Sequence, residues 1–310
     1  MAKKHPVTTH ILNTLLRFGL GIMHMIALLP PCMKKGIGWA LRTLLIYYPS
    51  SLKRVATTNI ALCFPALSST EQQVLYHQNI SHLVTVLMDL LNLVWPARHS
   101  PLPSIRAIRG LEHLEAALNR QQGVLLLFPH LISIYLVGYL LIDRLPFSFS
   151  LMYNSPKNAV LKTFFDTEIK KHCSPVFTRQ ETHAMLQYLR EGHVIWYAPD
   201  LEPKLRHAVF APFFNRPAAT YATTARIAQL SGAVSIPIAF YRDEHTREYD
   251  VVFEAPLTDF PSGDPVQDAT HLNLTMEKII RKKPAQYLWL YKRYSRDEQG
   301  NKTDYYRVKK

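Results

Sequence analysis

The chain has 310 residues, a hydrophobic fraction of 48% and a formal net charge of +13. This length and apolar content suit one large globular domain with a smaller appendage, and they exclude an intrinsically disordered chain. The three cysteines lie far apart and form no CxxC pair, so neither a disulfide framework nor a cysteine zinc site is indicated, and a reducing compartment is expected.

The positive charge is concentrated at the two ends of the chain. Residues 1–70 contain no Asp or Glu but eight Lys and Arg residues, and residues 281–310 are also strongly basic. Basic ends on an apolar chain indicate an anionic partner: membrane phospholipid, an acidic protein or nucleic acid. Nucleic acid is the weakest of these, because the basic residues form no known recognition module. The alternative is a basic surface that is merely solvated.

Residues 11–30 form an apolar segment about as long as a membrane span, although it contains Arg17 and His24. Lysines flank the segment on both sides, so the charge bias gives no orientation. We therefore favour a helix embedded from the cytoplasmic face over a helix that crosses the bilayer. No small-residue cleavage site marks it as a removable signal peptide. The alternative is an amphipathic core helix.

A helical region follows the apolar segment. Residues 39–48 and 51–95 have helical spacing, with a break at Phe64-Pro65 and a helix-capping signal at residues 68–71. The proline-containing residues 99–104 are the best boundary with the rest of the chain. The sequence thus predicts three parts: a membrane-associated helix (1–32), a helical subdomain (33–104) and an α/β domain (105–310).

Within the third part, short apolar runs alternate with segments of helical periodicity. Strands are expected near residues 106–109, 123–128, 148–153, 175–178, 193–198, 208–213, 233–240 and 249–254. Helices are expected near residues 111–120, 131–142, 156–172, 180–191, 219–231 and 266–281. This alternation predicts an α/β fold with a mixed, mainly parallel sheet covered by helices on both faces.

Two of the predicted buried strands end in a proline followed by a titratable residue. Residues 124–128 precede Pro129-His130, and residues 193–198 precede Pro199-Asp200. Side chains just past the carboxyl ends of central strands face the ligand crevice of an open α/β sheet. The imidazole and the carboxylate are therefore expected to meet, which would raise the basicity of the histidine. The alternatives are a structural histidine and a capping aspartate.

Several familiar motifs are absent. The sequence contains no GxGxxG, Walker loop, GxSxG or HExxH, which argues against nucleotide binding, serine hydrolysis and zincin chemistry. No metal is predicted, because the histidines lack partners at ligand spacing.

Five stretches of the sequence, in one order along nearly the whole chain, resemble the bacterial lipid A late acyltransferases, the lauroyl and myristoyl acyltransferase family. These stretches are residues 54–73 (RVATTNIALCFPALSSTEQQ), 108–130 (IRGLEHLEAALNRQQGVLLLFPH), 189–200 (LREGHVIWYAPD), 207–238 (HAVFAPFFNRPAATYATTARIAQLSGAVSIPI) and 284–294 (PAQYLWLYKRY).

This resemblance implies a glycerolipid acyltransferase-like fold and a membrane-bound acyltransferase. The fatty acyl chain would pass from an acyl carrier protein thioester to a hydroxyl of a lipid A precursor, at the cytoplasmic face of the bacterial inner membrane. Acyl carrier protein, the lipid acceptor and membrane phospholipid are the implied partners. No bound cofactor is expected, since the donor carries its own phosphopantetheine.

In the family's catalytic motif a histidine is followed, after four residues, by Asp or Glu. By resemblance His130 is the general base, but the acid position is occupied by Tyr135. A neutral phenol supplies no charge to hold an imidazolium, so another acid must substitute or activity is weak. Asp200 and Glu202 are the candidate substitutes.

Three cations are candidates to bind phosphates of the acceptor or of phosphopantetheine: Lys157, Arg179 and Arg190. Each alone is as well explained as a solvated surface charge. Glu202 is a further candidate for substrate binding. Apolar residues near the strand ends are candidates for an acyl groove, with core packing as the alternative; they are Leu131, Ile134, Trp196, Phe210, Phe213 and Phe214. The loss of the motif acid leaves two further readings: an inactive homologue that binds lipid or acyl carrier protein, or an acyltransferase for another lipid acceptor.

Overall fold

The computed structural model describes residues 6–97, 102–142, 144–145 and 149–307. The chain begins with four helices: α1 (Pro6–Leu28), α2 (Pro31–Tyr47), α3 (Ser51–Cys63) and α4 (Ser69–Val94). Helix α2 begins earlier than expected because Pro31 occupies its first turn, where the missing N–H costs nothing. The predicted cap of α4 is confirmed, since Ser68 and Glu71 form a capping box. Part of the predicted 99–104 boundary lies outside the described residues.

A seven-stranded sheet in the described part of the chain carries the fold, in the order β1-β9-β8-β2-β5-β3-β4. Its strands are β1 (Ile105–Arg109), β2 (Val124–Leu127), β3 (Phe149–Met152), β4 (Val176–Phe177), β5 (Val194–Tyr197), β8 (Val234–Arg242) and β9 (Tyr249–Phe253). All neighbouring pairs are parallel except β8 and β9, which are antiparallel. The prediction of a mixed, mainly parallel sheet is confirmed.

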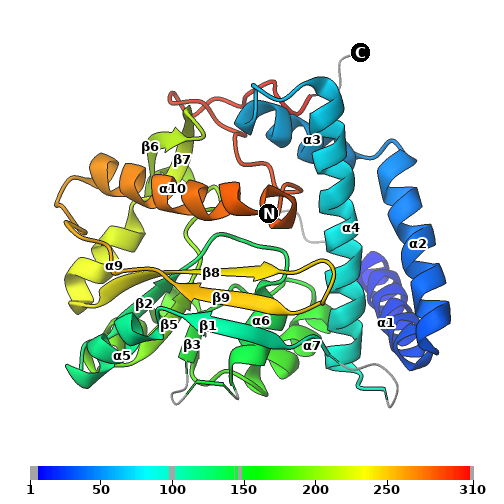
Figure 1. The fold of residues 1–310 in the computed structure, drawn as a ribbon, viewed down its shortest axis with the longest axis horizontal. Coiled ribbons are helices and arrows are strands. Elements are labelled where there is room, and N and C mark those ends of the chain that lie inside the picture. Colours follow the sequence, from blue (N-terminus) through cyan, green and yellow to red (C-terminus); the bar gives the residue numbers. More distant parts are fainter. Residues whose placement is uncertain (1–5, 98–101, 143, 146–148, 308–310) are drawn as a thin grey trace.

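Helices cover both faces of this sheet (Figure 1). Helix α10 and the hairpin of β6 (Ala208–Phe213) and β7 (Arg216–Tyr221) lie above it in this view, α5, α6 and α7 lie below, and α4 stands across one end. The helices of this part are α5 (Leu111–Asn119), α6 (Ile134–Ile142), α7 (Ala159–Lys170), α8 (Thr182–Arg190), α9 (Thr223–Ser231) and α10 (Pro265–Lys282), with short 3-10 turns η1 (Arg179–Glu181), η2 (Leu205–His207) and η3 (Pro284–Gln286).

The helix predicted over residues 219–231 begins only at Thr223, and its first residues belong to a strand that was not predicted. This strand, β7 (Arg216–Tyr221), pairs with β6 (Ala208–Phe213) in a separate two-stranded hairpin. The two residues between them, Phe214 and Asn215, have φ values of 50° and 59°, which is the geometry of a tight hairpin turn. Phe214 tolerates this conformation because its N–H donates to buried Glu277 at 2.6 Å. A contact from distant α10 thus selects the hairpin.

The N-terminal helices share the hydrophobic core of the sheet region. Two buried asparagines bind η3 and the segment that follows it. Asn79 of α4 donates to the carbonyls of Ala285 and Tyr287, each at 2.8 Å. Asn59 of α3 donates to the carbonyls of Trp289 and Tyr291, each at 2.7 Å. The N-terminal helices and the sheet region thus pack continuously, and the division of the chain into three parts stays a prediction.

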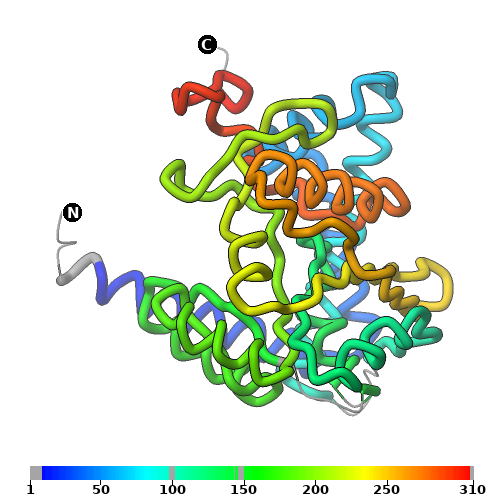
Figure 2. Tube along the Cα trace, turned by 90° about the vertical axis from the view of Figure 1, so that its left-hand side faces the viewer, coloured from blue at the N-terminus to red at the C-terminus, as the bar shows by residue number. Residues whose placement is uncertain are grey.

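Helix α1 lies along α4 and α7. Asn158 donates to Asn13 at 2.8 Å, and His24 stacks on Trp95, which in turn stacks on Phe164. Figure 2 shows α1 beside the green helices at the base of the molecule, with its N-terminal end extending outward. Its segment Thr9–Leu28 is the one helix in the described residues that is long and apolar enough to cross a membrane.

The other face of α1 is strongly apolar and open to the surroundings, with Leu15, Phe18 and Met25 at least 61% exposed. Lys34, which the sequence analysis counted as a flanking charge, is buried. Its ammonium group donates to the Ala27 carbonyl and to Asn92 of α4, so it ties α1 to α4. Lys3 and Lys4 lie outside the described residues.

Candidate active site

His130 and Asp200 lie opposite each other past the ends of two neighbouring strands. Strands β2 and β5 are parallel, and their register pairs Leu127 with Tyr197. Each titratable residue stands three positions beyond this pair, so the register itself brings them together. His130 Nδ1 lies 2.5 Å from Asp200 Oδ1, and the His130 backbone N–H donates to Oδ2 at 2.9 Å. One carboxylate thus fixes both the ring and the backbone of the histidine.

The Asp200 side chain is 0% exposed, whereas the His130 side chain is 24% exposed. Burial alone would raise the pKa of Asp200, but the charge of His130 and the hydrogen bonds from His130 and Tyr287 outweigh burial and hold this pKa below its ordinary value of 3.8. The ionised carboxylate only accepts hydrogen bonds, so Nδ1 carries a proton. The other ring nitrogen, Nε2, is then able to take a proton from a substrate.

Tyr287 supports the carboxylate from the C-terminal segment. Its phenol is buried and hydrogen-bonded to Asp200; burial and the neighbouring carboxylate raise the pKa of Tyr287 well above its usual value, so it stays protonated. The segment is fixed to the histidine by two backbone hydrogen bonds, from Leu288 to the His130 carbonyl at 3.0 Å and from Ile132 to the Gln286 carbonyl at 2.9 Å. Asn79 holds the same segment from α4.

Tyr287 was not predicted from the sequence to belong to the site. It lies within residues 284–294, one of the stretches that carried the family resemblance, but it is 157 positions after His130 with no spacing rule to connect them. The feature of the sequence that points to Tyr287 is the cluster of aromatic residues in an otherwise basic end of the chain.

Tyr135 occupies the first turn of α6, and its side chain is 53% exposed. Within the described residues no hydrogen bond or ion pair joins Tyr135 to His130. Asp200, and not the residue at the motif position, therefore contacts the imidazole in this structure.

The three predicted phosphate-binding cations do not all lie at the same edge of the sheet. Lys157 is exposed in the loop after β3. Arg179 follows β4 and donates to the Tyr221 hydroxyl at 2.9 Å. Both loops follow strands whose carboxyl ends lie at the same edge of the sheet as His130. Arg190 is the last residue of α8 and precedes the start of β5, so it lies at the edge of the sheet opposite to His130. Its guanidinium donates to the Leu230 carbonyl at the end of α9. The structure does not gather the three cations into one cluster.

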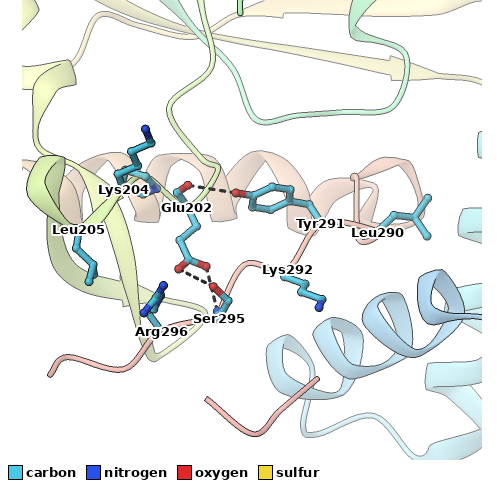
Figure 3. Close-up of a pocket in the computed structure, with 9 residues that line it drawn as sticks. Glu202, Lys204, Leu205, Leu290, Tyr291, Lys292, Ser295 and Arg296 are labelled. Carbon is cyan, nitrogen blue, oxygen red and sulfur yellow. Dashed lines mark hydrogen bonds between the residues drawn. The ribbon is translucent and has the colours of Figure 1, made fainter. Parts of the chain in front are cut away.

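Glu202 lies two residues after Asp200, but its carboxylate does not contact the histidine. Its two oxygens accept hydrogen bonds from the N–H and the hydroxyl of Ser295, at 3.0 and 2.8 Å (Figure 3). Among the proposed groove residues, four are buried in the core: Leu131, Trp196, Phe213 and Phe214.

The ionisation of Asp200 predicts how stability depends on pH. Because the pKa of Asp200 is depressed in the folded state, the unfolded chain binds more protons between that pKa and 3.8. The free energy of unfolding should therefore fall as the pH drops below about 3.8, and it should fall less steeply in Asp200→Asn. Denaturant unfolding of both proteins at pH 5, 4 and 3 checks this. Parallel pH dependences would contradict the assigned charge state.

The fold and this site define a class: an α/β protein with a histidine–carboxylate pair suited to remove a proton from a hydroxyl. Residues 1–296 match the bacterial lipid A biosynthesis acyltransferase family, and the chain belongs to this family. The resemblance noted in the sequence is thereby confirmed.

Individual relatives match over most of their length. The chain is 26% identical over 286 residues to the lipid A biosynthesis lauroyltransferase of Escherichia coli (strain K12), a match that covers 91% of this chain and 92% of the relative. It is 25% identical over 290 residues to the palmitoleoyltransferase of the same organism, with 93% of each chain covered. The myristoyltransferase of that organism is 23% identical over 275 residues, which cover 88% of this chain and 84% of the relative.

Proposed function

We propose that this protein transfers a fatty acyl chain from an acyl carrier protein thioester to a hydroxyl of a lipid A precursor, with His130 as general base. The observation that carries the proposal is the His130–Asp200 pair, in which a buried, ionised carboxylate orients a partly exposed imidazole. Family membership and the names of the relatives support the reaction class and the acceptor. The glycerolipid acyltransferase-like fold stays a prediction.

In the proposed reaction Nε2 of His130 takes the proton of the acceptor hydroxyl as its oxygen attacks the thioester carbonyl carbon. The new C–O bond forms, the C–S bond breaks, and the proton passes to the departing phosphopantetheine thiolate. Asp200 stabilises the imidazolium that forms between these steps, and Tyr287 holds the carboxylate in place. The donor supplies the only prosthetic group, so no bound cofactor is needed.

The proposed location is the cytoplasmic face of the bacterial inner membrane. The exposed apolar face of α1 and the acid-free, basic first 70 residues suit a surface of anionic phospholipid. Acyl carrier protein is the proposed soluble partner, and basic charge on this chain complements an acidic carrier. Lys157 and Arg179 stay candidates for substrate contact because they follow strand ends on the histidine's edge of the sheet.

The direct test is acyl transfer by the full-length protein in detergent, with labelled acyl carrier protein and a lipid A precursor. Wild-type turnover that disappears in His130→Ala would support the proposal. Turnover that survives in His130→Ala would remove the histidine from the mechanism. Tight binding of carrier or lipid with no turnover would favour the inactive, binding homologue instead.

Changes at Tyr135 test which residue supplies the acid. Because Asp200 already holds Nδ1 of His130 and Tyr135 does not contact the ring, kcat/KM for Tyr135→Phe and Tyr135→Glu should stay within about threefold of the wild type. Steady-state kinetics with both substrates measure this. A gain of an order of magnitude in Tyr135→Glu would show that the protein lacks an effective acid, contrary to the role given to Asp200.

A further inference from the structure

The two chain segments that lead away from the His130–Asp200 pair line an open pocket of about 620 Å³. One segment begins at Glu202, two residues after Asp200, and the other runs through Tyr291 and Ser295. The Tyr291 hydroxyl donates to the Glu202 carbonyl at 3.1 Å and joins the two segments (Figure 3). The pocket is therefore built from the same two pieces of chain that position the catalytic carboxylate.

This pocket is positively charged. Its lining includes the cations Lys204, Lys292 and Arg296 and a single carboxylate, that of Glu202. The carboxylate is occupied, since both of its oxygens accept hydrogen bonds from Ser295. Three cations against one carboxylate leave a formal charge of +2.

None of the three cations forms an ion pair within the part of the chain that the structure describes. Elsewhere on the surface arginines do find carboxylates, as Arg106 does with Asp250 at 2.6 Å. Arg296 is nevertheless held in position, because its Nη1 donates to the Gly300 carbonyl at 2.8 Å. The Lys292 ammonium group lies 5.8 Å from the centre of the Tyr306 ring. Within the described residues the pocket thus carries a net positive charge, and at least the Arg296 guanidinium is held in a fixed position.

We propose that this pocket binds a phosphate group carried by one of the two substrates; the proposal rests on the proposed acyl transfer. Lysine ammonium groups and the forked arginine guanidinium are the side chains best suited to phosphate, and a phosphate monoester dianion balances a charge of +2. Pro203, Leu205, Leu290 and the Tyr291 ring add an apolar wall for the carbon skeleton beside the phosphate. The phosphate is either a monoester on the sugar of the acceptor, whose dianion matches the charge of +2, or the phosphodiester of the donor's phosphopantetheine arm, which carries a single negative charge.

The double variant Lys204→Gln/Arg296→Gln removes two of the cations. A matched control, Arg120→Gln/Lys278→Gln, removes the same charge outside the pocket lining. Arg120 follows α5, Lys278 lies on α10, and both are exposed. The KM of the substrate that carries the bound phosphate should rise about tenfold or more in the pocket variant and stay at the wild-type value in the control. Lys292→Gln, which breaks no hydrogen bond among the described residues, should raise the same KM by a smaller factor.

The two sources of phosphate give different patterns. If the acceptor supplies the phosphate, the pocket variant should have a raised KM for the phosphorylated acceptor. With a dephosphorylated acceptor, the pocket variant and the wild type should then have the same KM. If the donor supplies it, the KM of the acyl carrier protein thioester rises and that of the acceptor does not. If the KM values of the pocket variant for both substrates equal those of the control, the phosphate site is overturned.

A binding measurement separates the pocket from the reaction. Inorganic phosphate is titrated with full-length protein in detergent and followed by ³¹P line broadening, which needs no turnover. The wild type and the control should broaden the signal and the pocket variant should not. Equal broadening by all three proteins would overturn the site even if acyl transfer is found. Selective broadening without any acyl transfer would keep the site and reject the proposed function.

Discussion

Asp200→Asn is expected to lower kcat/KM for acyl transfer by roughly 10³–10⁴-fold. An asparagine keeps the size of the side chain but removes the charge that stabilises the imidazolium. It also presents an amide N–H₂ where His130 Nδ1–H needs an acceptor, which favours the wrong tautomer of the ring. Steady-state kinetics with acyl carrier protein thioester and a lipid A precursor measure the loss.

The control for this substitution is Asp259→Asn, the same change at an exposed residue with a φ of 52°, a conformation that asparagine also adopts readily. It should leave kcat/KM unchanged. Thermal unfolding of Asp200→Asn at neutral pH separates loss of catalysis from loss of the fold. A folded Asp200→Asn protein with nearly full activity would mean that the carboxylate only stabilises the structure at the strand ends and does not take part in catalysis.

Gly123→Ala should destabilise the fold by about 3 kcal/mol or more, because the new methyl group has no room. A Cβ at this position would lie 2.0 Å from the carbonyl oxygen of Leu189 and 2.7 Å from its carbonyl carbon. Both clashes are with backbone, so no side chain is able to turn aside. The start of β2 would have to separate from the end of α8, and circular dichroism should show a fall of about 5–10 °C in the midpoint of thermal unfolding.

The matched control is Gly138→Ala in α6, where an added Cβ meets nothing within 4 Å. An alanine in the interior of a helix is favoured over glycine by about 0.5–1 kcal/mol. The same chemical change should therefore raise the midpoint slightly at residue 138 and lower it strongly at residue 123. Equal midpoints for the two variants would contradict the close approach of β2 and α8.

Much of the α/β region was predictable because strand and helix periodicities differ clearly there. The strand over 208–213 was placed at its observed bounds, and α10 within one residue at each end. The hairpin partner β7 was missed because its turn depends on Glu277, a residue more than 50 positions later. The helix predicted over residues 39–48 begins at Pro31 instead, because proline fits the first turn of a helix, where its missing N–H costs nothing.

For the candidate site, the sequence by itself determined that His130 and Asp200 follow buried strands and a proline, and hence that both stand at the carboxyl edge of one sheet. Only the tertiary structure decided which acid meets the imidazole. The parallel register of β2 and β5 sets Asp200 opposite His130, while Glu202 accepts a hydrogen bond from Ser295 and Tyr135 lies exposed on α6. Local propensity encodes where a strand ends, whereas strand order, register and the C-terminal segment that brings Tyr287 depend on packing between residues far apart in the chain.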